Sequence, residues 1–105
     1  MTRIRMNPDD RKRQMVEAGL VLVRNYGVKA LTRVALAAET GTTDGLVNRY
    51  FGTREQMRSE IVIHGIKRED ATVLAQAIKS GLYRFEDVPP KLMRKAQALV
   101  PTLDS

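Results

Sequence analysis

Apolar residues from Met15 to Tyr26 recur at the three- and four-residue spacing of a helix with one buried face. The run 7–10, Asn-Pro-Asp-Asp, supplies a capping residue, a proline at the first helical position and two acids at the positive end of the helix dipole. Gly27 is the residue type that commonly follows the last turn of a helix. The pattern therefore predicts a helix over about 8–26.

The segment that follows predicts two short helices joined by a glycine turn. Thr32 can cap the first, which ends at Gly41, and Thr43 can cap the second, over 44–51, which Gly52 closes. The apolar positions expected to face inward are Val34, Leu36 and Ala37 in the first helix and Val47, Tyr50 and Phe51 in the second.

Three further helical stretches complete the chain. The Thr-x-x-Gln run at 53–56 is a capping box for a fourth helix, and the pattern leaves open whether that helix breaks at Asp70 or continues. An amphipathic rhythm covers 73–81, and the prolines at 89–90 begin a last helix that Pro101 stops. No segment alternates with period two for long enough to form a strand. The sequence predicts an all-α bundle of five to six helices.

Composition narrows the classes of partner. The 105 residues are 43% apolar, which fits one domain with one core. Eighteen basic against twelve acidic residues give a net charge of +6, and this favours a polyanionic partner, either nucleic acid or an anionic membrane. The longest early aliphatic stretch, 20–23, is far shorter than the roughly 18 to 20 residues that span a bilayer, and no signal peptide precedes it. We expect a soluble cytoplasmic protein with no membrane partner.

The sequence contains few of the residues and motifs that enzymes use for catalysis. Cysteine is absent, and His64 is the single histidine, set in an apolar helical stretch and expected to be a packed or surface residue. No phosphate-binding GxxxxGK loop and no GxSxG elbow occurs. We expect no metal, no cofactor and no enzymatic activity.

The two short helices have the layout of a helix-turn-helix, in which the second helix enters the DNA major groove. Gly41 permits the tight turn, and Ala37 lets the two helices approach. The polar side chains that the core does not need fall on the outer face, and they are Thr42, Thr43, Asp44, Asn48 and Arg49. A basic amino-terminal arm, able to track phosphates or equally a solvated terminus, contains Arg3, Arg5, Arg11, Lys12 and Arg13.

The stretch LTRVALAAETGTTDGLVNRYFGTREQM, residues 31–57, resembles the DNA-binding segment of the TetR family of transcriptional regulators. The likeness extends over about 11–66 of the chain. Two positions depart from the family pattern, Thr42 for a valine in the turn and Asn48 for a tyrosine that contacts phosphate. The matching residues are Thr32, Leu36, Ala37, Gly41, Thr43, Gly45, Val47, Tyr50, Phe51, Thr53, Arg54, Glu55 and Met57.

The resemblance implies a homeodomain-like, TetR-type bundle and assigns roles to residues. Within this assignment Arg33 can bind guanine, Leu46 can touch a thymine methyl, and Asp44 can accept from cytosine or orient an arginine. The alternative interpretation is that Thr32 and Thr43 are only helix caps, that Arg49 and Arg54 are solvated charges, and that Tyr50 is a residue at the edge of the core. Implied phosphate contacts are Thr32, Thr42, Thr43, Arg49, Tyr50 and Arg54; implied base contacts are Arg33, Asp44, Gly45, Leu46 and Asn48.

The resemblance also predicts how the chain divides. Residues 1–66 form the DNA-binding domain with its basic arm, and 67–105 form a short helical extension that either dimerises or caps the core. Family members carry a longer carboxy-terminal domain that holds an inducer, and the extension here is too short to enclose a cavity of about 300 Å³. The residues predicted to form a dimer interface are Val73, Leu74, Ala77, Ile78, Leu92, Ala96 and Leu99.

The function implied by this resemblance is that of a sequence-specific regulator of transcription. We expect a repressor that binds a double-stranded DNA operator as a homodimer and responds to no small-molecule ligand. The alternative from the same helices is a protein-protein interaction module, or an accessory regulator that binds a larger transcription factor.

Overall fold

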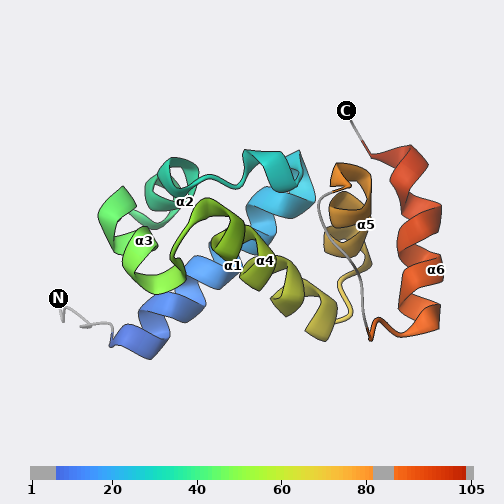
Figure 1. Cartoon of the computed structure of the whole chain (residues 1–105), viewed down its shortest axis with the longest axis horizontal. Helices are drawn as coiled ribbons and strands as arrows, with labels where there is room; N and C mark the ends of the chain where they lie inside the picture. The colour runs from blue at the N-terminus through green and yellow to red at the C-terminus, as the bar shows by residue number, and fades with distance from the viewer. Residues whose placement is uncertain (1–6, 82–86, 104–105) are drawn as a thin grey trace, which may run out of the picture.

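The computed structural model describes residues 7–81 and 87–103, which form an elongated helical molecule of 46 × 24 × 22 Å (Figure 1). No strand occurs in the described residues, so the all-α prediction is confirmed. The helices are α1 (Pro8–Tyr26), α2 (Arg33–Thr40), α3 (Asp44–Phe51), α4 (Arg54–Lys67), α5 (Ala71–Ser80) and α6 (Pro90–Leu99), with single 3₁₀ turns η1 (Val28–Ala30) and η2 (Val100–Thr102).

Side-chain caps begin the first four helices where the sequence predicts them. The Asn7 side chain accepts from the Asp10 amide at 2.8 Å, and Thr32 and Thr43 cap α2 and α3 in the same way, at 3.0 and 3.1 Å. At the start of α4, the Thr53 hydroxyl accepts from the Gln56 amide and the Gln56 side chain accepts from the Thr53 amide, so both bonds of the capping box are present. Because each cap satisfies backbone donors locally, these helix starts are fixed by a few residues each.

The break between α4 and α5 settles the alternative that the sequence left open. Asp70 caps α5 by accepting from the Val73 amide at 3.1 Å, and Glu69 before it adopts a positive φ of 56° that turns the chain. The other carboxylate oxygen of Asp70 pairs with Arg24 Nε of α1 at 2.6 Å. One aspartate therefore begins α5 and ties it to the end of α1.

The main core lies among α1, α2, α3 and α4, with one side of α5 closing it. Gly19 allows α4 to approach α1, since a Cβ there would lie 2.4 Å from Ile61 Cδ1. The fully buried side chains of this core with the largest volumes include Met15, Leu20, Leu31, Leu36, Met57 and Ile61.

Two residues predicted to face the core lie at the surface instead. Val34 is 68% exposed, because it is two positions before the buried Leu36 and so projects from nearly the opposite side of the short helix α2. Tyr26 is 73% exposed, because it is the last residue of α1 and follows the last buried position, Val23.

Helix α5 packs between the main core and α6 (Figure 1). Its outer side forms a second apolar cluster with α6, so each helix covers the apolar face of the other. Five of the residues predicted to form a dimer interface are buried by this packing within one copy of the chain, whereas Ile78 and Leu99 are partly exposed. The buried residues of the predicted interface are Val73, Leu74, Ala77, Leu92 and Ala96.

Candidate nucleic-acid interface

The connection between α2 and α3 is a tight turn held by its own hydrogen bonds. Gly41 adopts the left-handed conformation with φ of 65°, which favours glycine. The Thr40 hydroxyl donates to the Leu36 carbonyl at 2.9 Å and lies 2.8 Å from the Thr42 hydroxyl, while the Thr42 amide donates to the Ala37 carbonyl at 2.9 Å. The turn fixes α3 relative to α2 and engages the Thr42 hydroxyl internally.

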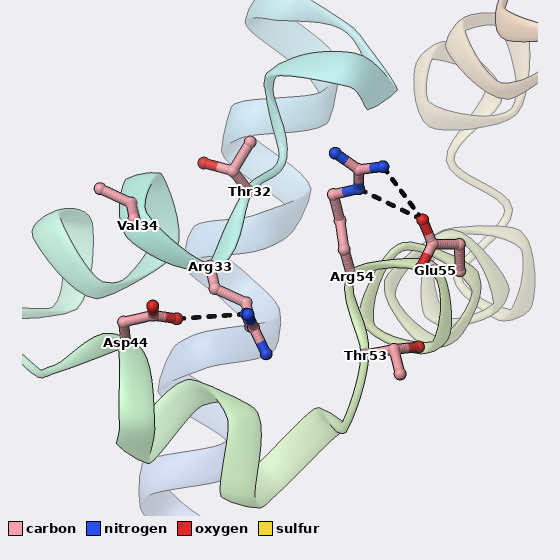
Figure 2. A pocket seen from close by; sticks show the side chains of 7 residues that line it. All are labelled: Thr32, Arg33, Val34, Asp44, Thr53, Arg54 and Glu55. Carbon is pink, nitrogen blue, oxygen red and sulfur yellow. Dashed lines mark hydrogen bonds and ion pairs between the residues drawn. The ribbon is translucent and has the colours of Figure 1, made fainter.

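The starts of α2, α3 and α4 border one open hollow of about 440 Å³ (Figure 2). Unpaired backbone N–H groups at a helix start carry partial positive charge, and three such ends border this hollow together with two arginines, whose charges Asp44 and Glu55 partly offset. A polyanion is the ligand class that this arrangement suits. The residues that line the hollow are Thr32, Arg33, Val34, Asp44, Thr53, Arg54 and Glu55.

Arg33 joins α2 to α3 at the edge of this hollow. Its Nε lies 3.2 Å from Asp44 Oδ1, and its terminal nitrogen NH1 donates to Asn48 Oδ1 at 2.9 Å. The side chains of Arg33 and Asp44 are 38% and 52% exposed, so the group is held in place and still accessible.

Arg54 and Glu55 pair at the first turn of α4 (Figure 2), with Nε and NH2 of Arg54 at 3.3 and 3.2 Å from Glu55 Oε1. The backbone N–H of Glu55 and then the Arg54 side chain lower the pKa of the Glu55 carboxyl below its usual value. Glu55 is therefore ionised at neutral pH and offsets part of the positive charge of Arg54.

A second hollow of about 290 Å³ lies where α3 meets the start of α1, lined by Pro8, Leu46, Arg49 and Tyr50. Arg49 is exposed, whereas Leu46 and Tyr50 are partly buried against the main core. Seven of the implied contact residues therefore line one of the two hollows, whereas Thr42, Thr43, Gly45 and Asn48 line neither.

The basic arm is described only from residue 7 onward, so Arg3 and Arg5 lie outside the described residues. Of its remaining members, Lys12 pairs with Glu60 at 2.9 Å and lies 5.5 Å from the centre of the Phe51 ring. Arg13 pairs with a carboxylate in the same helix. These contacts give two of the arm's cations intramolecular partners.

Every residue that the sequence assigned to DNA contact has an accessible surface. The exposed ones are Thr43, Asp44, Gly45, Asn48, Arg49 and Arg54, and the partly buried ones are Thr32, Arg33, Thr42, Leu46 and Tyr50. The larger hollow brings together Thr32, Arg33, Asp44 and Arg54, and the hydrogen bond from Arg33 adds Asn48.

Sequence reasoning missed two residues that bear on this surface. Val34 adds an exposed apolar side chain to the larger hollow. Arg58 is only 8% exposed and donates to the carbonyls of Leu31 and Lys29, both at 2.9 Å, so it anchors the loop that leads into α2. Arg58 lies four residues before the apolar Val62, and residues four apart share one face of a helix. This spacing was the signal in the sequence that Arg58 lies on the inner face of α4.

Other kinds of site are not found in the part of the chain that the structure describes. No three histidine, aspartate or glutamate side chains there gather as metal ligands, and none of its helices has the length and apolar character to cross a membrane. His64 is a surface residue, 39% exposed and 3.9 Å from Glu60, in line with the expectation from the sequence.

Among curated proteins, the chain is similar to the HTH-type transcriptional regulator BetI of Vibrio atlanticus (strain LGP32), with 28% identity over 69 residues. The matched segment covers 66% of this chain and 34% of that regulator, so the chain spans about a third of the relative's length. No family model matches the chain, and no solved structure matches it. The similarity supports a transcriptional regulator with a helix-turn-helix.

Proposed function

We propose that this protein is a sequence-specific, double-stranded-DNA-binding transcriptional regulator of the TetR type. The observation that carries the proposal is the open hollow at which the starts of α2, α3 and α4 meet, with Arg33 and Arg54 on its rim. The similarity to a helix-turn-helix regulator supports the same interpretation.

In the proposed complex, α3 lies in the major groove, which is about 12 Å wide and admits a helix. The helix starts at Thr32 and Thr43 then face phosphates, because their free backbone N–H groups and the helix dipole attract anions. Arg54 and Arg49 add charge to these phosphate contacts, and Tyr50 adds a hydroxyl group; the Thr42 hydroxyl can join them only by giving up its bond to Thr40.

In this complex the residues that contact base edges lie near the starts of α2 and α3. Arg33, Asp44, Gly45, Leu46 and Asn48 keep the roles that the resemblance implies for them. Val34 joins them, because an apolar side chain that is 68% exposed beside Arg33 suits the methyl group of a thymine.

The protein is further proposed to act as a homodimeric repressor in the cytoplasm, without a small-molecule inducer. One helix-turn-helix covers only part of a helical turn of DNA, so two copies on a palindromic site are needed for strong binding. Ile78 and Leu99 are the residues of the predicted interface that remain accessible for pairing.

Selection from a pool of random DNA duplexes tests the proposal. We expect the wild-type chain to enrich a palindromic sequence whose half-sites lie about 34 Å apart, one helical turn. Binding to the selected duplex should weaken steeply as salt rises. A chain that enriches no sequence and binds no duplex at low salt contradicts the proposed function.

A further inference from the structure

The guanidinium of Arg33 is held from two sides by side chains of α3. Asp44 contacts its Nε edge and Asn48 accepts from one terminal nitrogen, at 3.2 and 2.9 Å. We propose that these three residues form one guanine-reading unit in which Arg33 contacts the base and Asp44 and Asn48 act as positioning residues. This inference rests on the proposed function.

The free donors of Arg33 define how a base can approach it. The Asp44 carboxylate pairs with the guanidinium beside Nε, at 3.2 Å, and one NH1 hydrogen is donated to Asn48, so each terminal nitrogen keeps at least one free hydrogen. The two ends of the guanidinium fork can then donate in parallel to O6 and N7 of guanine. The Asp44 carboxylate lies 3.2 Å from Nε and competes with a base that approaches side-on, which favours end-on recognition of guanine.

Asn48 has a different role in this unit from that of an adenine-reading asparagine. Bidentate reading of adenine needs the amide oxygen to accept from N6 while the amide nitrogen donates to N7. In this protein the amide oxygen of Asn48 accepts from Arg33, so one of its two lone pairs and the orientation of the amide are committed to the arginine, while the amide nitrogen is free to donate. Asn48 therefore supports the arginine and offers a donor to a neighbouring acceptor on the DNA.

Asp44 is the first residue of α3, 52% exposed, on the surface proposed to face DNA. A carboxylate at this place repels phosphates and so weakens binding to every duplex equally. It also orients Arg33, and this strengthens binding only where a guanine meets the fork. Repulsion of phosphates lowers the affinity for all DNA, and orientation of Arg33 raises the affinity for sites with the guanine. Together they increase the ratio of specific to nonspecific binding.

Competition titrations with two Asp44 variants test the unit. The probes are the selected duplex, the same duplex with each guanine of the half-site replaced in turn, and a random duplex. We expect the wild type to discriminate about 5- to 150-fold at one guanine. Asp44→Asn keeps an acceptor oxygen and should lose part of that discrimination, whereas Asp44→Ala should lose most of it. Both variants should bind the random duplex more tightly than the wild type.

Two further variants make the result specific. Glu39→Gln removes an equal charge from an exposed position of α2 and should leave guanine discrimination unchanged. Arg33→Lys keeps the positive charge but lacks the fork, so it should lose discrimination at the same guanine as Asp44→Ala and at no other position. Circular dichroism checks the fold of each variant, and Arg33→Lys tests the unit independently if Asp44→Ala loses helix.

Full discrimination by Asp44→Ala, or by Arg33→Lys, would overturn the guanine-reading unit while leaving DNA binding intact. Loss of discrimination at every position together would assign Asp44 a merely structural role and would overturn the unit as well. Absence of any duplex binding by the wild type would instead remove the proposed function, and the inference with it.

Discussion

Arg58 of α4 donates from Nε to the backbone carbonyl of Leu31 at 2.9 Å, across 27 positions of the chain. The same guanidinium donates to the Lys29 carbonyl, also at 2.9 Å, and the side chain is nearly buried. These two carbonyls belong to the loop that leads into α2. Arg58 therefore sets where Thr32 and Arg33 begin the helix-turn-helix.

Replacing Arg58 by methionine should destabilise the fold by about 1.5 to 3 kcal/mol, because the buried Leu31 carbonyl and the partly buried Lys29 carbonyl lose a charged donor. Urea unfolding followed by circular dichroism measures the change. Arg54→Met is the matched control, since Arg54 is an exposed arginine of the same helix, and its effect should stay within about 0.5 kcal/mol. Equal losses for the two variants would contradict an anchoring role for Arg58.

Arg54→Ala should weaken binding to every duplex alike and lower the slope of log affinity against log salt by about one, because one phosphate contact is lost. Fluorescence anisotropy at several salt concentrations measures that slope. Arg94→Ala, on exposed α6 at the opposite end of the molecule, is the control with the same loss of charge (Figure 1). An unchanged slope for Arg54→Ala would remove this residue from the phosphate contacts.

Replacing Glu55, the partner of Arg54, should change the affinity for DNA in the opposite direction. The Glu55 carboxylate is charged at neutral pH, as an ordinary glutamate is, and its lowered pKa extends that charge to more acidic solution; the charge repels phosphates and pairs with Arg54. Glu55→Gln should therefore strengthen binding to all duplexes at pH 7. The gain should vanish when anisotropy is measured at high salt, because screening weakens exposed charges. A gain that persists there would mean that Glu55 acts through something other than its charge.

The helix starts were accessible to sequence reasoning because they depend on neighbours in the chain. The caps at Asn7, Thr32, Thr43 and Thr53 each bond to an amide three positions later, so a few letters of sequence contain both partners. The starts of α2, α3 and α4 around the larger hollow follow from the same local signals.

The features that the sequence did not predict depend on contacts between residues far apart in the chain. Arg58 binds carbonyls 27 and 29 positions away, and no local pattern identifies them. The apolar faces of α5 and α6 indicate that something covers them, and only the fold identifies the covering surface as the other helix of the same chain. In a helix as short as α2, the inward face is defined by few positions, which explains the error at Val34.

Val34→Ala should remove a thymine preference at one position of the selected duplex. Burying one methyl group contributes about 0.8 kcal/mol, which corresponds to about fourfold in affinity. Replacing individual thymines by uracil, which lacks that methyl, should weaken the wild type at the positions proposed for Val34 and for Leu46, and should leave Val34→Ala unaffected at the first of them. Because Val34 is exposed, the free energy of unfolding should hardly change. Equal sensitivity of both proteins to uracil would exclude this contact.

Asp70→Ala should lower the free energy of unfolding by about 1 to 3 kcal/mol, since it removes the cap of α5 and the pair with Arg24 together. Asp70→Asn keeps a capping oxygen and loses the charge, so it should fall between the wild type and alanine in a urea titration. If asparagine proved as damaging as alanine, the cap would contribute nothing and the ion pair would account for the whole loss.

The central claim is that DNA binds at the surface formed by the starts of α2, α3 and α4, and amide chemical shifts during a titration with the selected duplex test it most directly. We predict that the largest shifts fall at Thr32–Val34, Thr43–Asn48 and Thr53–Arg54. The amides of α6, whose exposed side chains include Lys91, Arg94 and Lys95, should remain unchanged. Shifts concentrated on α6, with the helix-turn-helix unaffected, would contradict the account.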